Sequence, residues 1–140
     1  MRRREARKYA LKILYQMDIR DEKADTILQD FWEFCKCKNK KIIDFAEEIV
    51  RKTEENLSLI DELISKCAIN WEIKRMSYID RNILRIATCE MFFLNQIPPI
   101  VSINEAIEIA KIYGTESSAK FVNGILNKMK EEKEKGGEKA

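Results

Sequence analysis

Apolar residues recur at intervals of three and four along nearly the whole chain, which is the period of an α-helix. In the first segment, Ala6, Ala10, Ile13, Leu14 and Met17 fall within one narrow arc when successive residues are placed 100° apart. We expect this stripe to bury the first helix against a core. The same spacing predicts further helices over 27–35, over 41–53 with a continuation to 64, over 77–95, over 102–113 and after 115–118 to 129, with a short helical turn at 71–76.

Glycine and proline are scarce, and this argues against a sheet. The first glycine is Gly114, and the only prolines are the adjacent Pro98 and Pro99. A sheet needs a turn about every ten residues, and turns favour glycine, proline and Asn-Gly pairs. The chain is therefore predicted to be all-α. Its 140 residues suffice for one domain that buries a core without disulfides or metals.

Residue types at helix ends predict where the last helices begin and end. Ser102 and Glu105 have the spacing of a capping box, and Gly114 stands where a glycine would end the same helix after Tyr113. Gly124 lies inside the following helix, where glycine costs about 1 kcal/mol relative to alanine. A close helix crossing or an approaching partner would explain it.

The C-terminal end differs in composition from the rest. From Lys130 to Ala140 the chain holds four lysines, four glutamates and a glycine pair. We therefore divide the chain into a single all-helical domain, residues 1–130, and a charged tail, residues 131–140, which we expect to be disordered.

Positive charge is concentrated at the N-terminus. Five of the seven residues from 2 to 8 are basic, and the first twelve residues carry six Lys or Arg against one Glu. The other 128 residues carry 20 basic and 23 acidic groups, so a local charge of +5 belongs to a chain whose net charge is only +2. Arg4, Arg7, Lys8 and Lys12 fall outside the apolar stripe, with Tyr15 among them.

A concentrated basic face with an interleaved aromatic ring suits a nucleic-acid backbone, because cations displace counterions and a ring can stack on a base. An anionic membrane or an acidic protein would accept the same face. The loop from Lys36 to Lys41, with four lysines and no acid, can extend this surface. A solvated linker is the favoured interpretation of that loop.

The sequence lacks the usual residues of catalysis and metal binding. Histidine is absent, and the four glycines cannot form a phosphate-binding loop or a dinucleotide fingerprint. Cys35, Cys37, Cys67 and Cys89 lack the paired spacing of a zinc site and are interpreted as thiols of a reducing compartment. We expect no cofactor, no metal and no enzymatic activity. No segment has the length of a membrane span or the features of a signal peptide, so we expect a cytoplasmic protein.

Charged residues of the helix at 77–95 leave two interpretations open. Glu90 falls in line with the buried stripe, where a carboxylate must be paired or hydrogen-bonded. A structural tie to a loop amide or an arginine is favoured over a catalytic acid. Asp80, Arg81 and Arg85 lie off the stripe, and they either face a partner or pair with one another or with Glu90 along the helix.

Four motifs in this chain resemble those of the NusB family of bacterial transcription antitermination factors, over nearly the whole length to about Met129. They occur in the family's order. The matching segments are 3–8 (RREARK) with 14–15 (LY), 80–87 (DRNILRIA) with Glu90, 103–114 (INEAIEIAKIYG) and 121–126 (FVNGIL).

The resemblance implies an all-α bundle of about seven helices, arranged as two packed three-helix-type sub-bundles. It implies a non-catalytic protein that binds the single-stranded boxA sequence of nascent RNA together with NusE, a small-subunit ribosomal protein. With other Nus factors and RNA polymerase, the pair would suppress termination and support ribosomal-RNA transcription. A homodimer in the absence of RNA is compatible with the family.

The resemblance also assigns roles to particular residues. The basic start of the first helix, Arg2 included, and the first residues of the last motif would meet RNA, whereas a second group would face NusE. Glu5 departs from the basic run, and Ser117 stands where some relatives carry an acid. A general RNA-binding protein and a purely protein-binding helical module remain rival hypotheses. The residues assigned to RNA are Arg2, Arg3, Arg4, Arg7, Lys8, Lys120 and Phe121, and those assigned to NusE are Tyr15, Asp80 and Arg81.

Overall fold

The structure, a computed structural model, describes residues 2–94 and 96–139, with side chains described as far as residue 136. Over these residues the chain forms seven α-helices and one 3-10 turn, without a strand, so the prediction of an all-α fold is confirmed. None of the described helices is long and apolar enough to span a membrane. The elements are α1 (Arg3–Arg20), α2 (Ala24–Phe34), α3 (Lys40–Glu55), α4 (Leu57–Cys67), η1 (Ile73–Arg75), α5 (Tyr78–Phe93), α6 (Pro99–Tyr113) and α7 (Ser118–Lys139).

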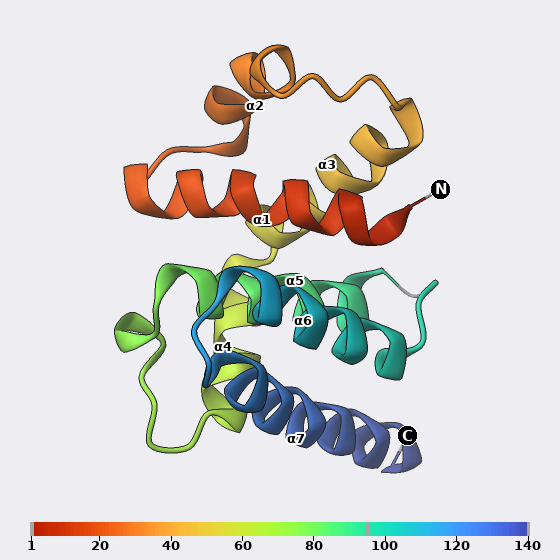
Figure 1. The fold of residues 1–140 in the computed structure, drawn as a ribbon. Helices are drawn as coiled ribbons and strands as arrows, with labels where there is room; N and C mark the ends of the chain where they lie inside the picture. Colours follow the sequence, from red (N-terminus) through yellow and green to blue (C-terminus); the bar gives the residue numbers. More distant parts are fainter. Residues whose placement is uncertain (1, 95, 140) are drawn as a thin grey trace.

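The helices form two bundles that share a central helix (Figure 1). Helices α1, α2 and α3 pack together in one bundle, and α4 to α7 form the other, so the expected pair of bundles is present, with four helices in the second. Helix α5 contacts α1 and α3 of the first bundle and α4, α6 and α7 of the second. Ten consecutive residues of α5, from Asn82 to Met91, are buried, because other helices cover it on all sides.

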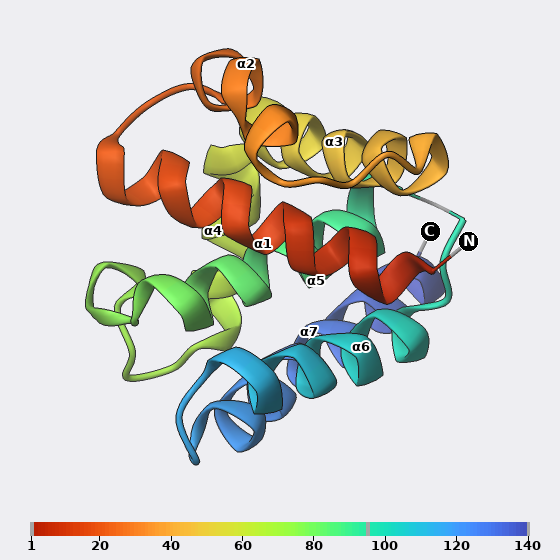
Figure 2. The same ribbon diagram turned by 45° about the horizontal axis from the view of Figure 1, so that its top comes forward.

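The predicted stripe of α1 does face the core. Ala6, Ala10, Ile13 and Leu14 are buried, and Met17 packs against them at the edge. Because α1 packs against both α3 and α5, its buried arc is wider than the stripe and also includes Leu11. The opposite side of α1 stays open to solvent along its length, between α2 and α3 on one side and α6 on the other (Figure 2).

The continuous apolar pattern from 41 to 64 is divided into two helices. At Asn56 the backbone leaves the helical region (φ −116°, ψ 22°), and the side-chain amide donates to the carbonyl of Lys52 at 2.9 Å. This bend allows α3 to pack against α1 while α4 packs against α5 and α7. The spacing alone did not indicate the break, because apolar positions before and after it keep the helical period.

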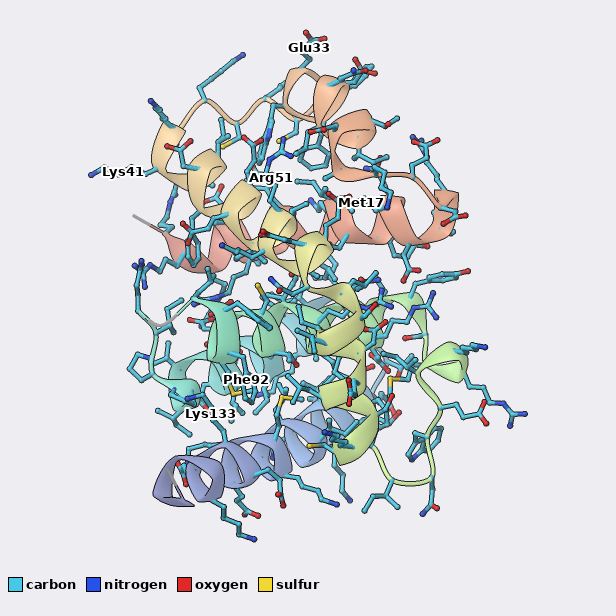
Figure 3. The ribbon with its side chains drawn as sticks, turned by 180° about the vertical axis from the view of Figure 1, so that it is seen from behind. Met17, Glu33, Lys41, Arg51, Phe92 and Lys133 are labelled. Atoms are coloured by element: carbon cyan, nitrogen blue, oxygen red, sulfur yellow. The ribbon has the colours of Figure 1, made fainter. Side chains whose placement is uncertain are left out.

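The disordered tail predicted for 131–140 differs from the structure, in which α7 continues as one helix to Lys139. Lysine and glutamate are strong helix formers, and Lys130 pairs with Glu134 one turn later at 3.0 Å. The Nζ atom of Lys133 lies 5.7 Å from the centre of the Phe92 ring of α5, and both side chains are seen from behind in Figure 3. Local propensity and this contact are the physical reasons for the extension.

The capping box predicted at Ser102 is wrong. Helix α6 begins one turn earlier, at Pro99. Proline fits this position because the amide hydrogen that it lacks would have no hydrogen-bond partner in the first turn of a helix. Ser102 is buried inside this helix. Gly114 does end α6, but with extended backbone (φ −92°, ψ −169°); a Cβ there would lie 2.8 Å from the Ala110 carbonyl oxygen and collide with Ser118.

Candidate nucleic-acid interface

Arg7 does not belong to the exposed cationic face, and its predicted placement there is wrong. Its side chain is buried, 2% exposed, and donates from Nε and Nη2 to the two carboxylate oxygens of Glu90 at 2.7 and 2.8 Å. The Ser102 hydroxyl also donates to Glu90, at 2.8 Å. The structural tie expected for Glu90 is therefore confirmed, whereas Arg7 has no surface to offer to a phosphate.

The remaining basic residues of α1 do reach the surface. Arg2, Arg4 and Lys12 are exposed, and Arg3 and Lys8 are half-buried. The Arg3 guanidinium lies 5.1 Å from the centre of the Phe45 ring, so its charge is held over α3. The first helix therefore presents most, but not all, of the cations that the sequence assigned to it.

Two of these cations have acidic partners. Arg4 donates from Nε to Glu105 of α6 at 2.6 Å, and this hydrogen bond and the carboxylate charge raise the pKa of Arg4. Arg2 pairs with Glu5 at 3.1 Å with a largely exposed side chain. Exposed pairs of this kind contribute little to stability. Among the described residues, Lys8 and Lys12 have no acidic partner within 4.0 Å.

A shallow open hollow of about 630 Å³ lies between α1 and α6, and the exposed cations border it. Two aromatic rings also line it: Tyr9 from α1 and Tyr113 from the end of α6. Burial, with nearby Cys35 and Cys37, raises the pKa of Tyr9 to about 12, so its hydroxyl remains neutral and able to donate. The full lining is Arg2, Arg3, Arg4, Glu5, Lys8, Tyr9, Lys12, Glu105 and Tyr113.

Lys120 and Phe121 lie at the start of α7 and do not line this hollow. Lys120 is exposed, and the half-buried Phe121 ring meets Trp71 edge to face, with ring centres 5.4 Å apart. Trp71 is 56% exposed, and the sequence did not indicate this contact because 50 residues separate the two rings.

The close helix crossing proposed for Gly124 is wrong, since a Cβ there would meet no atom within 4 Å. An approaching partner remains its predicted explanation.

Tyr15 and Arg81 lie together where α1 meets α5, whereas Asp80 is not among their contacts. The Tyr15 ring meets Tyr78 edge to face at 6.0 Å, and the Arg81 guanidinium lies 4.5 Å from the centre of the Tyr78 ring. Arg81 is not free, because it donates two hydrogen bonds of 2.7 Å to Asp18 of α1. Asp80 has a buried carboxylate oxygen without a hydrogen-bond partner among the described residues.

Asp18 is the centre of a polar cluster that sequence reasoning missed. It accepts from Arg81, from Asn82 at 2.9 Å and from Arg85 at 3.0 Å, and Arg85 also donates twice to Asp61 of α4. Burial opposes the charge of Asp18, but the hydrogen bonds from Arg81 and Asn82 and the charge of Arg85 hold its pKa below the ordinary value. The pairing of Arg81 and Arg85 with acids of their own helix is therefore wrong; their partners are on α1 and α4.

Metal binding has no geometric support in the described part of the chain. No group of three or more His, Cys, Asp or Glu side chains there is arranged to hold a metal ion. All four cysteines are free, and Cys67 and Cys89 are buried. Burial raises the pKa of the Cys89 thiol to about 11, so it is protonated at neutral pH.

The fold and this surface together define a class of protein: an all-helical, two-bundle domain that holds one cationic helix open to solvent. The sequence model of the NusB family matches residues 4–131. The chain therefore belongs to the NusB family, which confirms the resemblance seen in its motifs.

Known relatives support this assignment. The transcription antitermination protein NusB of Chloroherpeton thalassium is 46% identical over 125 residues, which cover 89% of this chain and 59% of that relative. The solved structure of T. maritima NusB has a TM-score of 0.83 at 45% identity and covers 92% of this chain and 90% of its own. A solved complex of NusB and NusE with double-stranded RNA has a TM-score of 0.83 at 31% identity and covers 91% of this chain and 94% of that one.

Proposed function

We propose that this protein is a transcription antitermination factor that binds boxA RNA of nascent transcripts together with NusE and supports transcription of ribosomal-RNA operons. It acts by binding, without catalysis, as one part of an assembly with other Nus factors and RNA polymerase. Membership of the NusB family and the likeness to a NusB–NusE complex with RNA support the proposal. The observation that carries it is the cationic hollow between α1 and α6.

The hollow has the chemistry that a single RNA strand requires. Lys8, Lys12, Arg2 and Arg4 supply charges for phosphates, and Tyr9 and Tyr113 supply ring faces or hydroxyl groups for bases. If four cations meet phosphates, the logarithm of the affinity should fall with the logarithm of the salt concentration with a slope of about −2.8, since each contact contributes about −0.7 for a single strand.

The face for NusE is the edge where α1 meets α5. Tyr78 is 40% exposed beside the half-buried Tyr15. An aromatic pair of this kind buries a large apolar area while it keeps hydroxyl groups for hydrogen bonds. Arg81 acts there through its position over the Tyr78 ring, because its Nε and Nη2 atoms already donate to Asp18 and its Nη1 atom to the Ile73 carbonyl. Lys120 and Phe121, with Trp71, form a further patch for the same RNA.

A gel-shift assay with the purified chain tests the proposal. The probe is a boxA-like RNA, and the control is a scrambled strand of the same composition, each with and without NusE. We expect preference for the boxA-like RNA and a stronger complex when NusE is present. Equal affinity for both RNAs would instead support a general RNA-binding protein.

The other rival hypotheses give different results in parallel assays. Capture of NusE that survives nuclease, with no RNA affinity of the purified chain, would support a purely protein-binding module. Methyl transfer or any other turnover by the isolated chain would overturn the non-catalytic assignment. We propose a homodimer for the RNA-free protein only. Sedimentation with and without RNA tests this, and a dimer that persists at saturating RNA would contradict the proposal.

A further inference from the structure

Phe34 is the most exposed large apolar side chain among the described residues, at 84%. It ends α2, directly before the connection that contains Lys36 and Lys38. The neighbouring rings of Phe31 and Trp32 pack against Tyr9 and the core, whereas Phe34 does not. A phenylalanine ring in this position contributes nothing to the bundle, so the fold gives no reason for it.

The residues beside Phe34 form a second basic hollow, of about 560 Å³, on the α2–α3 side of α1. Lys36 and Lys38 line it from the connection, Arg2 from the position just before α1, and Lys12 from α1 itself. Glu5 is the single acid of the lining, and it pairs with Arg2. Lys36, Lys38 and Lys12 have no acidic partner within 4.0 Å among the described residues. The lining therefore carries an excess of three positive charges without compensation.

This hollow adjoins the one between α1 and α6. Arg2, Glu5, Tyr9 and Lys12 line both hollows. Their spacing of three, four and three residues puts them on one face of α1, so they form a ridge between two basic surfaces. A strand that lies against α1 can cross this ridge without leaving the cations.

We propose that the hollow of Phe34, Lys36 and Lys38 binds a segment of single-stranded RNA that flanks the segment held between α1 and α6. The inference rests on the proposed RNA-binding function and extends the bound length of RNA. Lys36 and Lys38 meet phosphates, and Phe34 stacks on one base. An exposed ring between unpaired cations is the arrangement by which proteins bind single strands without base-specific hydrogen bonds. This segment of RNA is therefore bound irrespective of its sequence.

The connection from Lys36 to Lys41 is thus more than a solvated linker. The structure directs two of its lysines into the hollow, whereas Lys41, at the start of α3, points away into solvent (Figure 3). An acidic protein segment would also be attracted by the charge. The exposed ring, and its position next to the α1 ridge, favour RNA over such a segment, because a base can stack on the open face of a ring that stands free of the protein.

RNA length provides the test. The full chain is titrated with a minimal boxA-like RNA and with two RNAs that extend it by about six unstructured nucleotides on one side or the other. We expect one extension to increase the affinity about tenfold. Phe34→Ala and the double variant Lys36→Ala/Lys38→Ala should remove most of this gain and leave the affinity for the minimal RNA within about twofold. The double variant should also make the salt slope shallower by about 1.4 with the extended RNA.

Matched controls lie in the other bundle. Leu59→Ala removes an apolar side chain that is likewise exposed, and Lys66→Ala/Lys74→Ala removes the same charge from α4 and η1. Neither should alter the gain from the extension. All of these positions are exposed, so far-ultraviolet circular dichroism should show unchanged helix content in every variant.

Each alternative outcome contradicts the inference in a distinct way. A wild-type chain that binds the minimal RNA but gains nothing from either extension would overturn the inference and leave the proposed function intact. A chain that binds neither RNA would overturn both. Equal loss in Lys66→Ala/Lys74→Ala would show a general charge effect and overturn the inference. A polyglutamate peptide that binds through Lys36 and Lys38, while the RNA extensions have no effect, would assign the hollow to a protein partner.

Discussion

Arg7 and Glu90 form a buried ion pair that ties α1 to the central helix α5. Two hydrogen bonds of 2.7 and 2.8 Å join the guanidinium to the carboxylate, whose exposure is only 1%. The pair fixes the rotation of α1 about its axis, because Arg7 can reach Glu90 only when the apolar stripe faces the core. The same rotation directs Lys8 and Lys12 toward the hollow between α1 and α6.

Loss of one partner of this pair should strongly destabilise the protein. Arg7→Ala leaves the Glu90 carboxylate buried without its cation, and removal of one partner of a buried pair costs about 3–5 kcal/mol. Urea unfolding followed by circular dichroism measures the change. The double variant Arg7→Met/Glu90→Leu replaces both charges with apolar groups and should lose less than the single variant. A loss below about 1 kcal/mol for Arg7→Ala would contradict the structural role.

Asp18 should make the stability depend on acid pH. Its pKa is lower in the folded protein than in the unfolded chain, where it is about 3.9. Its contribution is therefore complete above that value and is lost as the pH falls through the folded pKa. Asp18→Asn should be less stable than the wild type at pH 7, and the difference should shrink below about pH 4. Urea unfolding at several pH values measures the difference, with Asp44→Asn at an exposed position as the control for the substitution itself.

Lys8 and Lys12 should contribute to RNA affinity without a role in folding. Lys8→Ala/Lys12→Ala removes two cations of the α1 hollow that have no acidic partner, so the salt slope should become shallower by about 1.4. The free energy of unfolding should change by less than about 0.5 kcal/mol, as for surface positions in general. Fluorescence anisotropy at several salt concentrations measures the slope. An unchanged slope in a folded double variant would place the phosphates elsewhere.

Tyr78 should separate binding of the protein partner from binding of RNA. Tyr78→Ala removes the exposed ring that joins Tyr15 and Arg81, and an aromatic anchor of an interface is worth about 2 kcal/mol or more. We expect NusE to bind roughly thirtyfold more weakly, as measured by calorimetry, while RNA affinity without NusE stays the same. Weakening of RNA binding to the same degree would argue against a separate face.

Replacement of Gly114 and of Gly124 by alanine should change the stability in opposite directions. Gly114→Ala puts a Cβ against Ser118 and 2.8 Å from the Ala110 carbonyl oxygen, so the junction of α6 and α7 must shift and stability should fall. Gly124→Ala meets open space in a helix and should raise stability by about 1 kcal/mol. Thermal unfolding measures both. If a partner approaches Gly124, the stabilised variant should also bind RNA or NusE more weakly, and unchanged binding would exclude that explanation.

Much of the fold was predictable because buried residues recur along the chain with the period of an α-helix. Ala10 and Ile13 recur at helical spacing, and the core consists of such positions, so helix type and inner face follow from the chain itself. The helix ends were less predictable. The break at Asn56 and the start of α6 at Pro99 depend on which helices pack against each side, and neighbouring residues carry no signal of that packing.

The candidate site was predictable only in part, and Arg7 shows why. A helical projection places it beside Leu14 at the edge of the stripe, where the number of neighbouring helices decides between core and surface. The partners of Arg81 and Arg85 are likewise remote, since Asp18 precedes them by more than 60 residues. Trp71 beside Phe121, and Lys36 beside Lys12, could not be paired from a sequence alone.

The sequence by itself determined that this protein is helical, that its positive charge is concentrated on the first helix, and that it belongs among the NusB proteins, because periodicity, composition and local motifs are properties of neighbouring residues. Only the tertiary structure decided which of those cations remain available. Arg7 is buried in an ion pair with Glu90, and Arg4 pairs with Glu105, whereas Lys12 and Lys36 line the same hollow. Electrostatic interactions act through space, so the availability of each cation for a bound anion depends on the groups that the fold brings within a few ångströms of it.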